Sequence, residues 1–370
     1  MSSNFLKDRG PAKYFHGRKE IIDTFNGALE LFREDKDGTT FLIQGAPGAG
    51  KTALLDVLSK HAKKNGWKPI LINTNTLWSP DELLRRLDKS GRQITSFGAE
   101  AGVDHVGHGS FNINIKTAAH TISDILRGQK KPLLLILDEA QTLGMPDVVP
   151  SEMKGVTTSI LKEIHNGDLG RSIMLLAGGL GTTESGFRTF GISRFMRKCK
   201  VPLGCLSHES TCAIIRDFLI HEGGVSKPPI EWIETIAERT NGWPQHIISY
   251  ADPAVKYLAS KQTPTDEGLD MVLQQGREEQ IEYYDQRAHD IDEDLRQAFA
   301  RAVMDVPTDG TTTKPAITSS LKQNGLTQKE ADDLFTQALY QGVIDQRKGG
   351  RYGIPIPSLH AWLVDGYAKD

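Results

Sequence analysis

Four apolar runs in the first half of the chain predict β-strands, and helix-forming segments lie between them. The runs occupy residues 41–44, 68–75, 133–137 and 171–179. Residues 133–137 are five consecutive apolar side chains, which is typical of a central parallel strand buried on both faces. Before the first run, apolar side chains recur at helical spacing, at Ile21, Ile22, Phe25, Leu29 and Phe32. The pattern predicts an α/β fold with a doubly wound parallel sheet.

The periodicity becomes helical from Leu206 onwards. Ser207 is the expected N-cap of a first helix, and two more helices are expected around residues 230–239 and 244–259. A polar helix over about 269–290 leads to helices near 294–303, 315–324 and 327–341, and Thr327 and Glu330 have the spacing of a capping box. Residues 342–357 alternate as a hairpin. We therefore expect a core at 1–205, a helical lid at 206–262, a linker helix at 263–289 and a last domain at 290–370.

A glycine-rich stretch follows the first run, and its pattern predicts a phosphate-binding loop. Residues 45–52 read GAPGAGKT, which fits the P-loop pattern G-x-x-x-x-G-K-[ST] between a strand and a helix. Glycines let consecutive backbone N–H groups point into one concavity, and the helix from Lys51 adds the positive end of its dipole. Lys51 would reach the β- and γ-phosphates, and the Thr52 hydroxyl would ligate Mg²⁺. The expected nucleotide contacts are Gly45, Ala46, Pro47, Gly48, Ala49, Gly50, Lys51, Thr52 and Ala53.

Two acidic residues, Asp138 and Glu139, end the third run. The carboxyl ends of parallel strands form the sheet edge at which α/β folds bind ligands. Alone, the pair would fit a turn cap as well as a catalytic site. Together with the upstream P-loop it predicts a Walker B motif, in which Asp138 holds the Mg²⁺ shell and Glu139 polarises the attacking water. The sequence thus predicts an ATPase that uses ATP and Mg²⁺, with Lys51 and Glu139 in catalysis.

Composition narrows the function only slightly. A hydrophobic content of 38% and a charged content of 25% describe an ordinary globular protein. The net charge of −3 gives no sign of nucleic-acid binding, although a local basic patch is compatible with it. Cys199, Cys205 and Cys212 match no zinc or redox spacing, so reduced thiols are expected. Without a signal-peptide pattern or a membrane-spanning run, we expect a cytoplasmic protein with no membrane partner.

The segments around the two motifs resemble AAA+ ATPases of the replication-initiator and STAND signalling kind. Residues 14–20 resemble the family's hhGRExE box, with Tyr14, Phe15, Gly17, Arg18 and Glu20 at the matching positions. In that family the box packs on the adenine and ribose side of the nucleotide. Residues 242–244 resemble its G-x-P element. The resemblance implies an AAA+ core with a helical lid, and it adds Phe15, Gly17, Arg18 and Pro244 to the nucleotide contacts.

The same resemblance points to an arginine finger in residues 187–203. Arg194 stands in an S-R-F context and is the candidate catalytic arginine, with Arg188 and Arg197 as alternatives, and a merely solvated basic turn is equally open for each. An arginine supplied in trans makes hydrolysis depend on assembly, so a homo-oligomer is expected. The family's polar sensor residues are missing, because the fourth run ends in Ala177, Gly178 and Gly179 and because Gln245 replaces the usual arginine. These departures predict a slow, partner-dependent switch.

Residues 91–117 are rich in glycine and end in the alternating Phe111, Ile113 and Ile115. We expect a β-hairpin or a flexible excursion there. In AAA+ relatives this place carries pore loops or hairpins that touch a polymer or a neighbouring subunit. A surface loop without a partner is the alternative.

The C-terminal three helices and hairpin resemble a winged-helix domain. Its expected wing tip is basic, with Arg347, Lys348 and Arg351, whereas the candidate recognition helix carries acidic residues that repel phosphates (Glu330, Asp332 and Asp333). Two function classes therefore stay open. One is an oligomerising ATPase that regulates replication or transposition on DNA. The other is a signalling or defence switch whose ATP state regulates a partner protein through the winged helix.

Overall fold

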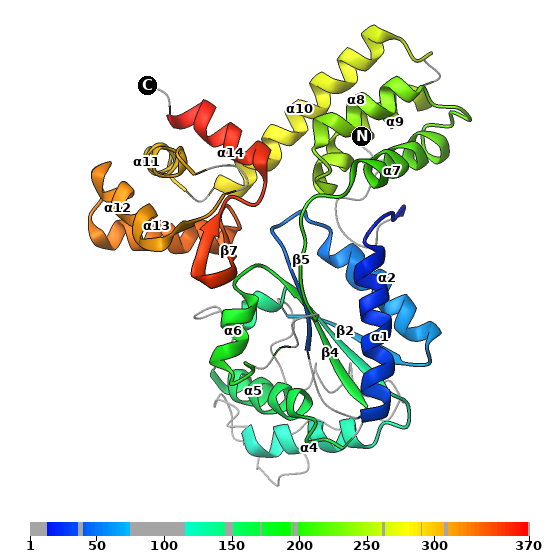
Figure 1. Ribbon diagram of the computed structural model, residues 1–370, viewed down its shortest axis with the longest axis vertical. Helices are drawn as coiled ribbons and strands as arrows, with labels where there is room; N and C mark the ends of the chain where they lie inside the picture. Colours follow the sequence, from blue (N-terminus) through cyan, green and yellow to red (C-terminus); the bar gives the residue numbers. More distant parts are fainter. Residues whose placement is uncertain are drawn as a thin grey trace, which may run out of the picture. The chain divides into compact units, whose positions relative to one another are not determined.

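Figure 1 shows the computed structural model, which describes residues 13–35, 40–74, 115–144, 151–170, 172–193, 195, 199–260, 263–289, 291–306 and 310–368. Two compact units divide these residues. One contains Lys19–Gln44 and Leu54–Pro202, and we call it the sheet unit. The other, the helical unit, contains the residues up to Arg18, the loop Gly45–Ala53 and the residues from Leu203 onwards.

The sheet unit is built on five parallel strands. They are β1 (Thr40–Gln44), β2 (Lys68–Asn73), β3 (Leu133–Asp138), β4 (Ile173–Gly179) and β5 (Lys200–Pro202), in the order β2-β3-β4-β1-β5. All residues of β3 and β4 are buried, which confirms the prediction of central strands covered on both faces. The four predicted strands are present, and the short edge strand β5 is an addition to the prediction.

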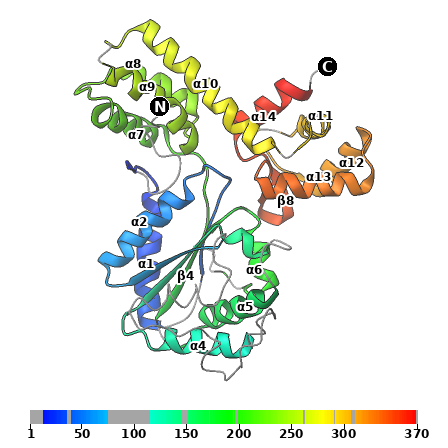
Figure 2. The same ribbon diagram turned by 180° about the vertical axis from the view of Figure 1, so that it is seen from behind.

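Helices cover both faces of this sheet. Figures 1 and 2 show α1 (Lys19–Asp35) and α2 (Lys51–Lys64) on one side and α5 (Ser151–Asn166) on the other. One face packs alternate strand residues, such as Leu133 and Leu135, against α4 (Ile115–Arg127) and α5. A 3-10 turn η1 (Ala140–Gly144) and α6 (Thr183–Thr189) follow β3 and β4. The chain therefore has the predicted P-loop α/β fold with a parallel sheet between helices.

One local prediction was wrong. Ile115, taken as the end of an alternating strand, is the first residue of α4. In α4, Ile122 and Leu126 are buried four residues apart, so a helical face and not an alternating one meets the core. The preceding part of the glycine-rich segment, residues 91–114, lies outside the described residues.

Three packed helices begin the C-terminal part of the helical unit. They are α7 (His208–His221), α8 (Ile230–Thr240) and α9 (Pro244–Ala259), and they share one hydrophobic core. The Ser207 hydroxyl accepts a hydrogen bond from Ser210 N, which confirms the predicted N-cap. The long helix α10 (Asp266–Ala288) starts three residues before the expected start at residue 269, because Thr265 caps it.

The last part of the chain combines helices with a small antiparallel sheet. Its helices are α11 (Glu293–Val303), α12 (Lys314–Gln323), α13 (Gln328–Gln341) and α14 (Pro357–Leu363), followed by a π-helical turn at Val364–Ala368. The strands β6 (Thr312–Thr313), β7 (Asp345–Arg347) and β8 (Arg351–Gly353) take the order β6-β8-β7. Thr327 and Glu330 form the predicted capping box, and β7 and β8 form the predicted hairpin. Among the described residues, no helix has the length and apolar character to cross a membrane.

Candidate functional site

The predicted P-loop has the backbone that a phosphate cradle needs. Gly48 and Gly50 have φ values of 78° and 84°, in the left-handed region that side chains disfavour. Ala49 N donates to Ala46 O at 3.2 Å, which closes the turn before α2 begins at Lys51. Backbone N–H groups at the start of α2 and the helix dipole then favour an anion there. The predicted strand, loop and helix are thus confirmed in the order that the motif requires.

The Lys51 ammonium lies inside this loop. It is 7% exposed, and its Nζ donates to Gly45 O at 2.9 Å and to Ala46 O at 3.0 Å. A phosphate oxygen that enters the loop competes with these carbonyls for the ammonium, and it offers a stronger charge-assisted bond. Thr52, half-buried in the first turn of α2, brings a hydroxyl oxygen of the hard kind that Mg²⁺ prefers.

Residues of α9 and α10 lie against the P-loop. Gln245 N donates to Gly48 O at 3.2 Å, and the Tyr283 hydroxyl donates to Pro47 O at 2.7 Å. A Cβ on Gly48 would come within 2.8 Å of both the Gln245 side chain and the Tyr283 hydroxyl oxygen. A Cβ on Gly50 would be 3.6 Å from the Pro244 ring. The predicted contact residue Pro244 therefore lies at the loop, and Tyr283 is a neighbour of the loop that sequence reasoning missed.

The residues of the predicted hhGRExE box that belong to the helical unit contact α7. The Tyr14 hydroxyl donates to Glu222 Oε1 at 2.7 Å, and the Tyr14 ring meets Phe218 edge to face. Gly17 has a φ of 81°, and a Cβ on it would lie 2.8 Å from Ser210 Oγ. Arg18 also has a positive φ, of 61°, and donates to Gly204 O. Burial lowers the pKa of Arg18.

Phe15, the residue after Tyr14 in the same segment, is half-buried. Residues 14–18 of the box and the P-loop are both part of the helical unit, whereas Glu20 belongs to the sheet unit. The left-handed backbone of Gly17 and Arg18 explains why a glycine stands in the box, and the tight fit of Gly17 against Ser210 fixes the segment on α7.

The predicted Walker B pair stands at the carboxyl end of β3. Asp138 is 6% exposed, and its Oδ1 accepts a hydrogen bond from Glu139 N at 3.0 Å. Glu139 has a φ of 57°, a strained conformation for a residue with a side chain. Thr74, after β2, holds this turn because its hydroxyl lies 2.8 Å from Asp138 O and 2.7 Å from Glu139 O. The Thr74 hydroxyl therefore fixes the backbone of the turn that carries both carboxylates.

Gln141 is a second residue near the candidate site that sequence reasoning missed. Its Nε2 donates to Glu139 Oε2 at 2.6 Å, and its Oε1 accepts from Leu180 N, just beyond β4, at 3.1 Å. Gln141 is 7% exposed, so both bonds lie away from solvent. The amide therefore links the predicted catalytic carboxylate to the end of the neighbouring strand. The signal in the sequence was a glutamine two residues after Glu139, opposite a strand end that has no polar side chain of its own.

The end of β4 has no room for the polar side chain expected there in AAA+ relatives. A Cβ on Gly179 would lie 2.2 Å from Thr183 Oγ1 and 2.7 Å from Gln141 Oε1. Thr183 is fully buried, and its hydroxyl donates to Leu180 O at 2.7 Å. Gln141 thus occupies the space beside this strand end.

The candidate arginine fingers are only partly within the described chain. Arg194 and Arg197 lie outside the described residues. Arg188 lies on α6, and its guanidinium pairs with Glu184 at 2.8 Å, four residues earlier on the same helix. Lys200 pairs with the same carboxylate, and together the two cations keep the pKa of Glu184 low against the opposing effect of its burial.

His246, which follows Gln245 at the position of the missing sensor arginine, is buried in the helical unit. Its Nδ1 lies 3.1 Å from Gln280 Nε2, and its ring is fully inaccessible to solvent. Burial lowers the pKa of His246 to about 4, so the imidazole is neutral at physiological pH. It therefore offers no positive charge to a phosphate.

Comparison with solved structures gives the fold for nearly the whole chain. A Walker-type ATPase of Pyrococcus abyssi superposes with a TM-score of 0.60 at 14% identity, covering 98% of this chain and 99% of that one. The ORC2 protein of Aeropyrum pernix, in ADPNP–ADP complexes, has a TM-score of 0.60 at 15% identity, covering 98% and 95%. Cdc6p from Pyrobaculum aerophilum has a TM-score of 0.51 at 13% identity, covering 99% and 98%.

No protein-family model matches the sequence, and no curated protein matches it either. The likeness to the ORC2 and Cdc6p structures, at 15% and 13% identity, shows a common fold.

Proposed function

We propose that this chain is a Mg²⁺-dependent AAA+ ATPase that assembles with copies of itself and acts as a regulator on DNA. One observation carries the proposal: Asp138 and Glu139 end a wholly buried strand whose carboxyl end shares a sheet edge with that of β1. The residue that follows β1 is Gly45, the first of the P-loop. The P-loop and the Asp138–Glu139 pair thus both follow strands that end at the same edge of one sheet.

Each residue has a distinct role in this proposal. The backbone N–H groups of the P-loop and Lys51 hold the phosphates of ATP, and Asp138 and Thr52 supply oxygen ligands for Mg²⁺. The donor set fits that ion, because Mg²⁺ takes oxygen ligands and keeps several waters in its shell. Glu139 polarises the water that attacks the γ-phosphate. Bound Mg²⁺ would neutralise charge that develops on the phosphates.

The ATPase proposal is tested by two variants with separate expectations. Glu139→Gln keeps the shape of the side chain but removes the base, so nucleotide affinity should stay and turnover should disappear. Lys51→Ala removes a phosphate ligand, so nucleotide affinity itself should fall. Turnover and nucleotide binding are measured with and without Mg²⁺, and Glu30→Gln, an exposed change on α1, serves as the control. Wild-type turnover in Glu139→Gln would refute the assignment of the base.

Action on DNA is supported by the C-terminal hairpin. Arg347 is exposed at the end of β7, followed by Lys348 and two glycines with left-handed backbones. Arg351 has a structural role in addition, because its guanidinium donates to Thr311 Oγ1 at 2.6 Å and to Thr311 O at 2.7 Å. We interpret the hairpin as the wing of a winged helix, with Arg347 and Lys348 as its phosphate contacts.

The DNA proposal predicts that full-length protein binds duplex DNA with a steep salt dependence. Replacing Arg347 and Lys348 by glutamine should lower the slope of log affinity against log salt by about two, since each phosphate contact contributes about 0.9. Lys63→Gln with Lys64→Gln, two exposed positions on α2, is the matched control. The mass of the particle, measured with and without ATP and DNA, tests the assembly.

The signalling alternative has its own support in α13. Glu330 is exposed and Asp332 is half-buried there, and Asp332 pairs with Lys314 of α12 at 2.8 Å, which reduces the positive charge available to DNA. If the protein binds no DNA at low salt but forms oligomers with ATP, the regulator on DNA is excluded. The C-terminal domain is then better explained as a contact for a partner protein.

A further inference from the structure

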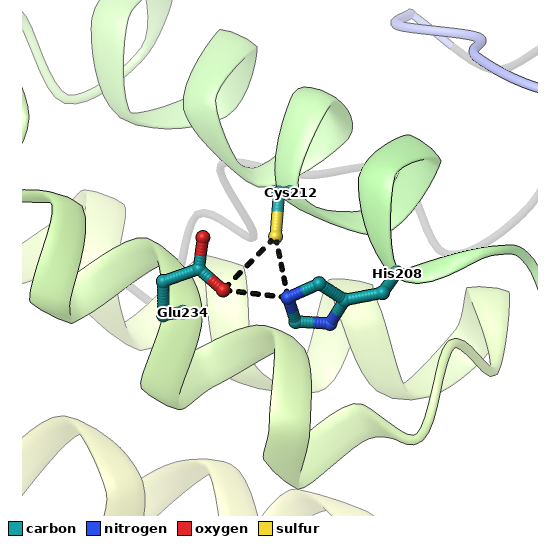
Figure 3. A group of neighbouring side chains, drawn as sticks. All are labelled: His208, Cys212 and Glu234. Carbon is teal, nitrogen blue, oxygen red and sulfur yellow. Dashed lines mark hydrogen bonds and ion pairs between the residues drawn. The ribbon is translucent and has the colours of Figure 1, made fainter.

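Three side chains of α7 and α8 converge on one point (Figure 3). His208 Nε2 lies 2.5 Å from Glu234 Oε2, and Cys212 Sγ lies 3.5 Å from the same nitrogen and 3.8 Å from the same oxygen. The three atoms lie within 4.8 Å of one another. An imidazole nitrogen, a thiol and a carboxylate thus face a common centre.

The fold holds these groups on a packed framework. His208 and Cys212 are four residues apart on α7, so they lie on one face of the helix. The backbone of Cys212 is fixed because its side chain belongs to the core shared by α7 and α8, next to Trp232 and Ile233. Glu234 follows these two core residues on α8. The separation of the two helices at this point is therefore set by hydrophobic packing.

We propose that His208, Cys212 and Glu234 form a binding site for a divalent transition metal ion, with Zn²⁺ as the fitting ion. Zn²⁺ binds cysteine sulfur at about 2.3 Å, histidine nitrogen at about 2.0 Å and carboxylate oxygen at about 2.1 Å. In a tetrahedron these bond lengths separate the ligand atoms by roughly 3.3–3.6 Å. The two distances from Cys212 Sγ are close to that range.

The distance from His208 Nε2 to Glu234 Oε2 is shorter than this range, and the exposure of both side chains allows it to increase. Nε2 of His208 and Oε2 of Glu234 are in direct hydrogen-bond contact at 2.5 Å, so they must separate by roughly 1 Å to admit the ion. Their side chains are 57% and 44% exposed, which leaves both free of the packing that fixes Cys212. The exposure also leaves a fourth coordination position open to water.

Charge and donor type both select the ion. A thiolate and a carboxylate cancel the two charges of Zn²⁺, so the complex is neutral where Cys212 is buried. Thiolate and imidazole are donors of the softness that Zn²⁺ prefers over Mg²⁺ or Ca²⁺. Burial and the neighbouring Glu234 raise the pKa of Cys212, so the metal must displace a proton from sulfur.

A bound metal ion would cross-link α7 and α8. The metal would join the first turn of α7 to the middle of α8, and the binding free energy would add to the stability of the helical unit. This site uses none of the residues assigned to ATP, so it stands independently of the proposed ATPase activity.

Cobalt(II) is the probe for this site. Reduced full-length protein, freed of metal by a chelator and kept without nucleotide, is titrated with Co²⁺. We expect one equivalent to give a thiolate-to-cobalt charge-transfer band with the visible bands of tetrahedral Co²⁺, and Zn²⁺ to abolish both. Cys212→Ser should lose the charge-transfer band, while His208→Ala and Glu234→Gln should each weaken Co²⁺ binding at least about tenfold.

The two other cysteines provide matched controls. Cys205→Ser removes an exposed thiol and Cys199→Ser a buried one, and both variants should keep the band. Circular dichroism of each variant confirms that it is folded, and Zn²⁺ should raise the melting temperature of the wild type but not of Cys212→Ser. Absence of the band in folded wild-type protein, or a band that survives Cys212→Ser, would overturn the proposal.

Discussion

At the scale of single residues, the side-chain amide of Gln141 both donates and accepts a hydrogen bond. Its Nε2 donates to Oε2 of Glu139, and its Oε1 accepts from the backbone N–H of Leu180. Glu139 needs such support because its backbone is in the left-handed region, with a φ of 57°, where a side chain costs roughly 1 kcal/mol or more. Gln141 is therefore a positioning residue for the proposed base.

Loss of this amide should reduce turnover without reducing nucleotide binding. A hydrogen bond to a charged group contributes about 1.5–3 kcal/mol, so Gln141→Ala should lower kcat by roughly 10- to 100-fold at an unchanged affinity for ATP. Gln129→Ala is the matched control, since Gln129 makes hydrogen bonds remote from Glu139 on the same unit. The kcat and nucleotide affinity of both variants give the answer. Equal kcat in Gln141→Ala and wild type would show that Glu139 needs no such support.

The residues of the two ATPase motifs could be identified from sequence because each motif is local. Residues 45–52 and the pair Asp138 and Glu139 are short patterns attached to apolar runs, and the structure places both at the predicted strand ends. Gln141 could not be found with the same certainty, because its partner Leu180 is 39 residues away. The grouping of Cys212 with Glu234 across two helices was likewise hidden, since cysteine spacing alone carries no sign of it.

At the scale of elements, α9 and α10 pack closely where a glycine faces a tyrosine. A Cβ on Gly276 would lie 2.3 Å from Cδ1 of Tyr250, whose ring is 2% exposed. The Tyr250 hydroxyl donates to Gln280 Oε1 at 3.3 Å one turn further along α10. The glycine therefore sets the distance between the two helices.

A methyl group at this crossing should destabilise the protein. Gly276→Ala gains helix propensity of about 1 kcal/mol, but the overlap with Tyr250 should outweigh that gain and cost about 1–3 kcal/mol net. Gly27→Ala on α1, where a Cβ meets nothing within 4 Å, is the control and should stabilise its helix by roughly 0.5–1 kcal/mol. The urea midpoint of each variant measures the change. A midpoint raised equally in both variants would contradict the close packing.

Elements with a clear burial or capping pattern could be predicted from the sequence. A very short strand, and a helix whose first residues alternate in polarity, could not. The buried runs of β3 and β4 and the capped helices α7 and α13 agree with the sequence because burial and capping are encoded locally. Strand β5 has three residues and exists because β1 offers it a parallel edge, which is a long-range condition. The start of α4 was misread because Ile113 and Ile115 alternate, whereas the core contact comes from residues further along.

At the scale of the whole molecule, the compact units do not follow the order of the chain. Gly45–Ala53 belongs with the residues from Leu203 onwards, although the strand before it and most of α2 after it belong to the sheet unit. Contacts such as that of Gly48 with Gln245 depend on residues almost 200 positions apart. Sequence patterns give segments in linear order, so they do not contain this discontinuous division.

The stability of the whole protein should depend on pH through His246. Its pKa is about 4 when folded and about 6.5 when unfolded, so the unfolded chain binds the extra proton between these values. Stability from the neutral imidazole is therefore complete above pH 6.5 and is lost as the pH falls towards 4, by about 1.4 kcal/mol per pH unit and about 3 kcal/mol in all.

Comparison with His246→Asn isolates this contribution. The difference in unfolding free energy between wild type and His246→Asn should change across pH 4 to 6.5, while His289→Asn, an exposed position, should leave the pH profile of the wild type unchanged. Denaturant unfolding at a series of pH values measures it. Parallel profiles for wild type and His246→Asn would show that His246 titrates normally in the folded protein.

The two neighbouring tyrosines of α10 have one more consequence. Tyr283 donates to Pro47 O of the P-loop, and Tyr284 donates to Ser358 Oγ of α14 at 2.6 Å. Successive residues on a helix point about 100° apart, so one turn of α10 contacts the P-loop with Tyr283 and α14 with Tyr284. If ATP alters the bond to Pro47 and this change reaches the bond to Ser358 through α10, a molecule bound at α14 and ATP change each other's affinity by the same factor.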